Sequence, residues 1–179
     1  KAVEVFGSID VMANFAGGTA VRMRKVDRNK YPEFPDVPID IYDWGIDVNL
    51  KGPIYFARTL MPQMVAKKSG VIVMLGSVTG FEGDGVGAMY GTSKSGLFNF
   101  VKGLAMAGAP HGVRALCVTP GPVLSRAAMS NMPTLMGRAA ELEELVDVIL
   151  FMCSDNASFI TGSNHVVDGG RLCMYQKTY

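Results

Sequence analysis

Apolar and polar positions follow two different periods along the chain, which predicts strands and helices in succession. Short apolar runs at residues 9–14, 71–75, 113–118 and 164–167 predict strands, and the two middle runs are continuous enough for strands buried on both faces. Between them, apolar residues recur at helical spacing over three longer segments, residues 41–68, 89–109 and 139–153. The alternation predicts an α/β fold with a doubly wound, Rossmann-like parallel sheet.

Glycine and proline predict where the first long helix breaks. Pro53 and Pro62 are expected to kink or interrupt it, because proline lacks the amide that an inner helical turn needs. Gly70 is expected to end it, since glycine accepts the left-handed conformation that helix ends adopt.

Two segments without strong periodicity are predicted as loops. Residues 18–40 form a long loop, basic in its first half and proline-rich in its second, and loops of this length are usually functional or mobile. Residues 76–87 are rich in glycine. Their last part, Gly83-Asp-Gly85-Val-Gly-Ala88, matches a relaxed dinucleotide fingerprint, but no acidic residue closes a βαβ unit about 20 positions later. We therefore do not assign pyrophosphate binding to it.

Composition narrows the class of protein. The 179 residues are 49% hydrophobic and 18% charged with a net charge of +1, which excludes a disordered chain and argues against a nucleic-acid partner. No apolar run reaches about 18 residues, and the first residues lack the apolar core of a signal peptide, so no membrane partner is expected. The odd cysteine count and spacing predict a cytoplasmic protein with free thiols and no metal site.

The most informative pair of side chains is Tyr90 and Lys94. Four residues apart on a predicted helix, the phenol and the ammonium share one face. A nearby ammonium stabilises phenolate and lowers the tyrosine pKa, which suits proton exchange with an alcohol or a carbonyl. The same spacing is also typical of an ordinary surface pair on a helix.

Strand ends supply the context that favours chemistry at this pair. Ser77 follows the buried strand at residues 71–75, Asn14 ends the preceding strand, and Pro120 follows the next one. The carboxyl ends of parallel strands meet at one edge of the sheet, where doubly wound folds bind ligands. Taken singly, Ser77 also fits a strand-end cap, and Asn49 also fits a polar residue at a helix kink.

Together these motifs make the chain resemble the short-chain dehydrogenase/reductase family. The matching motifs occur in the family's order along nearly the whole chain: Asn14-x-Ala16-Gly17, Asn49 within residues 47–52, Ser77, Tyr90-x-x-x-Lys94, Pro120-Gly121-x-Val123 and Val167-Asp-Gly-Gly170.

The resemblance implies a role for each matching residue. Tyr90 would be the general acid/base, Lys94 would lower its pKa and bind the nicotinamide ribose, and Ser77 would hydrogen-bond the substrate oxygen. Asn49 would hold a water that links Lys94 to a proton relay. NAD or NADP would be the cofactor, and its further contacts would be Asn14, Ala16 and Gly17 near the adenosine ribose, and Pro120, Gly121, Val123 and Ser125 near the nicotinamide.

The main departure from the family concerns the N-terminal side. The family's first strand, its glycine-rich turn and the pyrophosphate-binding helix have no counterpart before Asn14. We therefore expect residues 1–179 to form one domain, the C-terminal two thirds of an N-terminally truncated family fold. Phe15 and Ser125 stand where the family commonly has asparagine and threonine.

The resemblance implies reversible hydride transfer between a nicotinamide cofactor and a secondary alcohol or ketone. Apolar residues within 123–138 favour a mainly apolar small-molecule substrate, either alicyclic or steroid-like, although a short sugar stays open. A catalytically inactive chain that serves as an oligomerising scaffold is the alternative. Surplus apolar residues on the 89–109 helix, and the family's habit of pairing its long helices, favour a homodimer or homotetramer.

Overall fold

A parallel sheet organises the part of the chain that the structure describes. The computed structural model describes residues 2–27, 29–31, 34–83 and 87–176. Its strands lie side by side in chain order and all run in the same direction: β1 (Val11–Asn14), β2 (Gly70–Leu75), β3 (Val113–Pro120) and β4 (Asn164–Val167). The helices are α1 (Ala2–Phe6), α2 (Ala20–Met23), α3 (Ile39–Ile46), α4 (Gly52–Lys67), α5 (Thr79–Glu82), α6 (Ala88–Gly108) and α7 (Leu142–Cys153).

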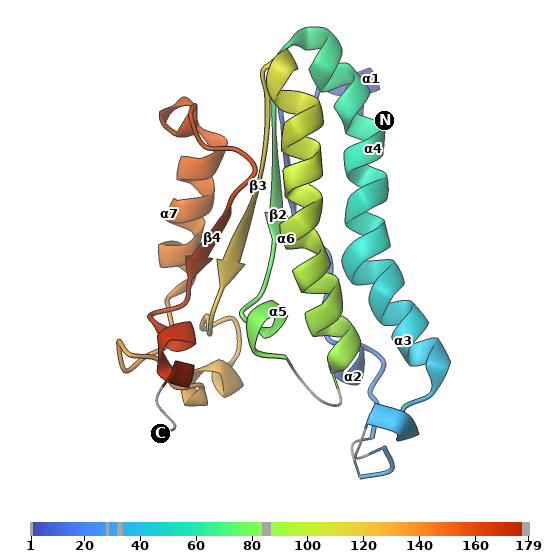
Figure 1. The fold of residues 1–179 in the computed structure, drawn as a ribbon, viewed down its shortest axis with the longest axis vertical. Coiled ribbons are helices and arrows are strands. Elements are labelled where there is room, and N and C mark those ends of the chain that lie inside the picture. The colour runs from blue at the N-terminus through green and yellow to red at the C-terminus, as the bar shows by residue number, and fades with distance from the viewer. Residues whose placement is uncertain (1, 28, 32–33, 84–86, 177–179) are drawn as a thin grey trace.

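Helices cover the sheet on both faces, as Figure 1 shows, with α4 and α6 on one side and α7 on the other. Alternation along the strands explains this division. Ile72 and Met74 of β2 pack with α4 and α6, whereas Val73 between them packs with α7. The predicted doubly wound α/β fold is confirmed, because both faces of the central strands carry apolar side chains that a helix must cover.

Glycine and proline act differently from the prediction at two places. Gly70 does not end the helix: Lys68 takes the left-handed conformation (φ +55°) after α4, and Gly70 begins β2. Glycine is needed there because a Cβ would lie 2.6 Å from the Met64 side chain. Pro62 lies inside an uninterrupted α4, while Pro53 follows a π-helical turn at Asp47–Lys51. The predicted break therefore occurs only before Pro53.

The predicted loops contain short helices. Residues 18–40 include α2 and a 3-10 turn at Phe34–Asp36, and the glycine-rich segment after β2 includes α5. Half of the relaxed fingerprint at residues 83–88, namely positions 84–86, lies outside the described residues. The helix predicted from residue 139 begins at Leu142, because Glu141 forms the N-cap.

Strand β1 forms one edge of the described sheet. It pairs with β2 on one side, and no other described strand pairs with it. Val11 and Phe15 are 42% and 53% exposed, so apolar side chains gather along this edge.

Candidate active site

The carboxyl ends of β1, β2 and β3 bring the predicted site residues to one edge of the sheet. The segment after β2 is held against β3 by two backbone bonds, from Gly76 N to Val118 O (2.8 Å) and from Val78 N to Pro120 O (3.1 Å). This close approach requires glycine at position 76, since a Cβ would lie 2.2 Å from Thr119 Oγ1. The backbone therefore fixes Ser77 at the rim of the sheet.

A cavity of about 420 Å³ opens at this edge. It is large enough for a small organic ligand. Six of the predicted residues contribute to its wall: Ser77, Tyr90, Pro120, Gly121, Val123 and Ser125. Asn14, Ala16, Gly17, Asn49 and Lys94 are not part of that wall.

Tyr90 and Ser77 meet at the cavity. Tyr90 enters from the first turn of α6, and the burial of its phenol raises its pKa above the usual value of 10.0. A hydrogen bond with the Ser77 hydroxyl acts in the opposite direction, as do the charges of Arg126 and Arg22. Because burial is the larger effect, the phenol holds its proton at neutral pH.

Lys94 lies one turn further along α6 and is only 4% exposed. Its ammonium donates a hydrogen bond to the Leu75 carbonyl at 2.6 Å and lies 5.6 Å from the centroid of the Tyr90 ring. Burial lowers its pKa from 10.5 to about 8, with the nearby Cys117 thiol acting weakly the other way. Most of Lys94 is therefore still charged at pH 7.

The expected effect of Lys94 on Tyr90 is not seen in this structure. The spacing predicted a lowered tyrosine pKa, yet the pKa is raised, and Lys94 is absent from the groups that lower it. The physical reason is that both side chains are desolvated while the ammonium points to the Leu75 carbonyl.

Asn49 is fully buried in the π-helical turn and braces the segment after β1. Its Oδ1 accepts a hydrogen bond from the Gly18 amide (2.8 Å), and its Nδ2 donates to the carbonyls of Gly18 (3.0 Å) and Gly45 (2.9 Å). A Cβ at Gly17, where φ is +145°, would lie 2.5 Å from Asn49 Oδ1 and 3.6 Å from Lys94 Nζ. A missing side chain thus lets this turn approach both residues.

The remaining predicted residues lie along the two neighbouring strand ends. Asn14 is buried, and its Oδ1 accepts a hydrogen bond from the Ala16 amide at 3.1 Å. Phe15, which replaces the family's common asparagine, points to solvent with 53% exposure. On the other side, Gly121 packs tightly, because a Cβ there would lie 2.7 Å from Asp168 Cα.

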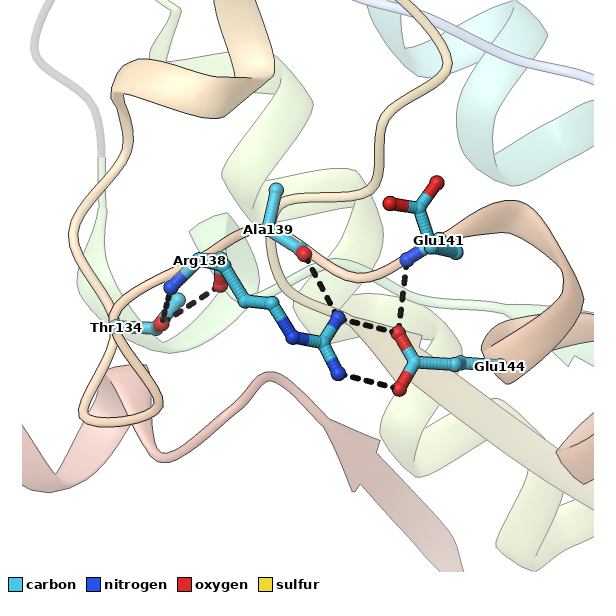
Figure 2. A network of polar contacts seen from close by, with 5 residues as sticks. All are labelled: Thr134, Arg138, Ala139, Glu141 and Glu144. Carbon is cyan, nitrogen blue, oxygen red and sulfur yellow. Dashed lines mark hydrogen bonds and ion pairs between the residues drawn. The ribbon is translucent and has the colours of Figure 1, made fainter.

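The segment after β3 forms one wall of the cavity and is anchored by a network around Arg138 (Figure 2). The Arg138 guanidinium donates to both carboxylate oxygens of Glu144, at 2.6 and 2.7 Å. Glu144 also accepts from the Glu141 amide (2.9 Å), which completes a capping box at the start of α7. Thr134 bonds both the carbonyl and the amide of Arg138. The hydrogen bonds from Arg138 and from the Glu141 amide lower the pKa of Glu144 to about 2.

A second arginine–glutamate pair also contacts this segment. Arg171, beyond β4, contacts Glu82 of α5 through two nitrogen–oxygen pairs, at 2.6 and 3.0 Å. The Arg171 and Glu82 side chains are only 11% and 8% exposed. Arg171 also donates to the Pro133 carbonyl at 3.1 Å. It therefore connects the chain after Ser77 to the wall-forming segment.

Three polar residues at the cavity were not assigned from the sequence. Thr79 bonds Ser77 through its hydroxyl and its amide, both at 3.2 Å, and so orients the serine. Arg22 and Arg126 line the cavity from α2 and from the segment after β3. Arg22 was visible only as one of several basic residues in a loop, and no motif marked Arg126.

Comparisons with known proteins agree with this geometry. A family model described as enoyl-(acyl carrier protein) reductase matches residues 1–171. The chain is 32% identical to a 7alpha-hydroxysteroid dehydrogenase of Bacteroides fragilis over 92% of its own length, and 34% identical to the 3-oxoacyl-(acyl-carrier-protein) reductase FabG of Thermotoga maritima over 95%. It spans 65% and 69% of these two relatives.

Solved structures give the same picture of the fold. A structure described as a short chain dehydrogenase/reductase family protein superposes with a TM-score of 0.79 at 26% identity, covering 94% of this chain and 69% of that one. A putative betaketoacyl-ACP reductase superposes with a TM-score of 0.78 at 24% identity, covering 94% and 70%. Within the described residues, no helix is long and apolar enough to cross a membrane.

Proposed function

The chain belongs to the short-chain dehydrogenase/reductase family, and from that premise we propose that it catalyses hydride transfer between a nicotinamide cofactor and a secondary alcohol or ketone. The observation that carries the proposal is the contact of Tyr90 with Ser77 at a cavity, with the buried Lys94 ammonium directly behind. Since the chain spans about two thirds of its relatives, the activity is proposed for the complete protein, meaning the product of its full reading frame.

Ser77 and Tyr90 handle the proton. A ketone oxygen in the cavity would accept hydrogen bonds from both hydroxyls. In the reductive direction the phenol gives its proton to that oxygen as the carbonyl carbon gains a hydride, and in the oxidative direction both return. A buried, protonated Tyr90 suits the reductive direction at neutral pH, and Ser77 stabilises the phenolate that remains.

The residues present fit the nicotinamide end of NAD or NADP, which supplies or accepts the hydride when bound. Lys94 is a buried ammonium whose one hydrogen bond leads to a carbonyl, so it retains donors for ribose hydroxyls. Because position 17 is glycine, no side chain there contacts that ammonium; a Cβ would lie 3.6 Å from Nζ. We propose that Asn14, Ala16 and Gly17 border the ribose, and that Pro120, Gly121, Val123 and Ser125 border the nicotinamide.

For Asn49 the structure supports a more limited role than a water ligand. Both Nδ2 hydrogens are used by backbone carbonyls, and Oδ1 holds the Gly18 amide. We propose that Asn49 acts mainly by holding the turn after β1 against α3. A bound water at its remaining lone pair stays a prediction.

The decisive test is Tyr90→Phe in the complete protein. The fold should persist and the turnover number should fall about 10²–10⁴-fold, because the proton donor is lost. Ser95→Ala is the matched control, since that hydroxyl lies on the same helix and bonds the Gly80 carbonyl outside the cavity wall. Near-normal turnover by Tyr90→Phe on an accepted substrate would refute the assignment.

We also propose that cofactor affinity requires residues beyond 1–179. Nothing before Asn14 matches the family's glycine-rich turn, whose helix N-terminus would hold the pyrophosphate. Calorimetry should find micromolar NAD or NADP affinity for the complete protein and much weaker affinity for residues 1–179. Equal affinity would mean that the cofactor site is misplaced.

We propose that the protein assembles as a homodimer or homotetramer and that it is located in the cytoplasm. An apolar groove of about 460 Å³ lies between α4 and α6, with Met61, Val65, Phe100 and Leu104 in its wall. Helices of a second copy would fill this groove. Sedimentation should show an oligomer that Leu104→Glu dissociates, whereas a monomer at micromolar concentration would contradict the proposal.

A further inference from the structure

Two arginines set the charge of the cavity. Arg22 and Arg126 are part of its wall, and every other residue of that wall is uncharged at neutral pH, with no aspartate or glutamate among the described lining residues. Both arginines are close enough to Tyr90 to lower the pKa of its phenol. The wall around the reacting group therefore carries two positive charges that no acid in the described wall offsets.

The two charges come from opposite sides of the site. Arg22 belongs to α2, which follows β1, and Arg126 follows β3, while Ser77 follows the strand that lies between those two. Neighbouring basic residues are neutralised: Arg24 pairs with Asp40 (3.5 Å), Arg138 with Glu144 and Arg171 with Glu82. No hydrogen bond or ion pair joins Arg22 or Arg126 to another described side chain.

The rest of the substrate wall is apolar. Met129 and Met132 line it together with Leu142 and Leu145 from the start of α7. In contrast, Leu135 and Met136, which the sequence suggested for an apolar pocket, are 65% and 66% exposed and do not line the cavity. The wall of the cavity thus combines an apolar surface with two cationic groups.

We propose that the substrate carries an oxyanionic group, a carboxylate or a phosphate, which Arg22 and Arg126 bind while the carbinol reaches Ser77 and Tyr90. This inference rests on the proposed function and names its substrate class. Guanidinium groups form paired hydrogen bonds with such oxyanions, and an apolar ring or chain between the anion and the carbinol would pack on the two methionines. The substrate is then an amphipathic hydroxy acid or keto acid, or its phosphorylated counterpart.

The first test compares matched substrates in the complete protein: hydroxycyclohexanecarboxylate, hydroxycyclohexanecarboxamide and cyclohexanediol monophosphate, each with NAD and NADP. The charged members should have at least about 10-fold higher kcat/KM than the amide, mostly through KM. Comparing kcat/KM of the carboxylate substrate with that of the phosphate substrate shows which oxyanion the site prefers. Arg22→Gln with Arg126→Gln should abolish the preference by reducing kcat/KM of the charged substrates to that of the amide, whereas Arg24→Gln should preserve the preference.

A binding measurement keeps the inference separate from the proposed function. Calorimetry with cyclohexanecarboxylate, which has no hydroxyl to oxidise, should show binding to the wild type that cyclohexanecarboxamide and the double variant lack. Turnover of the amide without a charge preference would overturn the inference and leave the oxidoreductase standing. A double variant that raises the KM of NAD or NADP while the charge preference persists would assign the arginines to the cofactor phosphates and overturn it as well. Anion binding without any turnover would instead count against the oxidoreductase alone.

Discussion

Lys94 and Arg171 are both largely buried cations, but their charges are stabilised in different ways. Arg171 is paired with a carboxylate that is as buried as itself, through two nitrogen–oxygen contacts. Lys94 has a backbone carbonyl and no carboxylate among the described residues, and burial lowers its pKa to about 8. A paired buried charge holds segments together, whereas an unpaired one keeps its hydrogen-bonding capacity for a ligand.

The largest effect is expected from a substitution of Lys94, the buried cation without a carboxylate partner among the described residues. Lys94→Met in the complete protein should reduce turnover about 10²-fold or more, because the ammonium proposed to bind the nicotinamide ribose is lost. It should not reduce the free energy of unfolding, since an apolar chain replaces a desolvated charge. Steady-state kinetics and urea denaturation measure the two quantities, and a strongly destabilised Lys94→Met would place Lys94 among the structural residues.

Changes to the Arg171–Glu82 pair should alter mainly the free energy of unfolding. Glu82→Gln leaves Arg171 largely buried without its carboxylate and should cost about 3 kcal/mol of the free energy of unfolding. The double variant Glu82→Leu/Arg171→Met should recover much of that loss. Asp40→Asn, in the exposed pair with Arg24, serves as the control and should change little. If Glu82→Gln were as stable as the control, the buried pair would not connect these segments.

The pH dependence of the free energy of unfolding provides a second test of Lys94. In the folded protein the pKa of Lys94 is about 8, below its ordinary value of 10.5. Between pH 8 and pH 10.5 the unfolded chain therefore binds more protons than the folded one. The free energy of unfolding attributable to Lys94 should therefore rise as pH increases from about 8 to 10.5, and its cost is fully present below 8. The difference between wild type and Lys94→Met isolates this part from Cys117, whose pKa burial raises to about 11. A difference that does not change over this range would contradict the shift.

The smallest effect is expected at the exposed pair of Figure 2. Glu144 titrates at about 2 instead of 4.5, so its stabilising contacts are complete above pH 4.5 and are lost as pH falls toward 2. Water screens this pair, so Arg138→Gln should barely change stability at pH 7. It should instead raise substrate KM by loosening the wall-forming segment. An unchanged KM would limit the network to capping α7.

The sequence predicted the framework well because each signal was local. Continuous apolar runs marked β2 and β3, and the final strand at Asn164–Val167 was predicted with its observed bounds. The same pattern placed Tyr90 and Lys94 on one helix. Gly70 was misjudged because its packing against Met64 involves a tertiary neighbour that spacing does not encode.

The positions of the candidate site residues in the fold followed from the sequence, whereas the pKa values of their side chains did not. Motif order led to Ser77, Tyr90 and Asn49, all of which lie at or beside the carboxyl edge. The raised pKa of Tyr90 depends on burial, which the sequence does not state. Arg126 escaped notice because its importance comes from the cavity that it faces, and the pairing of Glu82 with Arg171 joins positions 89 residues apart.

The tight backbone under the cavity bears on how this protein could acquire new substrates. A side chain at Gly76 would overlap Thr119 and Phe98, and one at Gly121 would overlap Asp168, whereas no side chain of residues 126–132 is fully buried. A library that randomises residues 126–132 should yield many folded variants with altered specificity. One that randomises positions 76 and 121 should yield mostly unfolded chains. New substrates should therefore be gained by changing the wall after β3, because the backbone at Gly76 and Gly121 has no room for larger side chains.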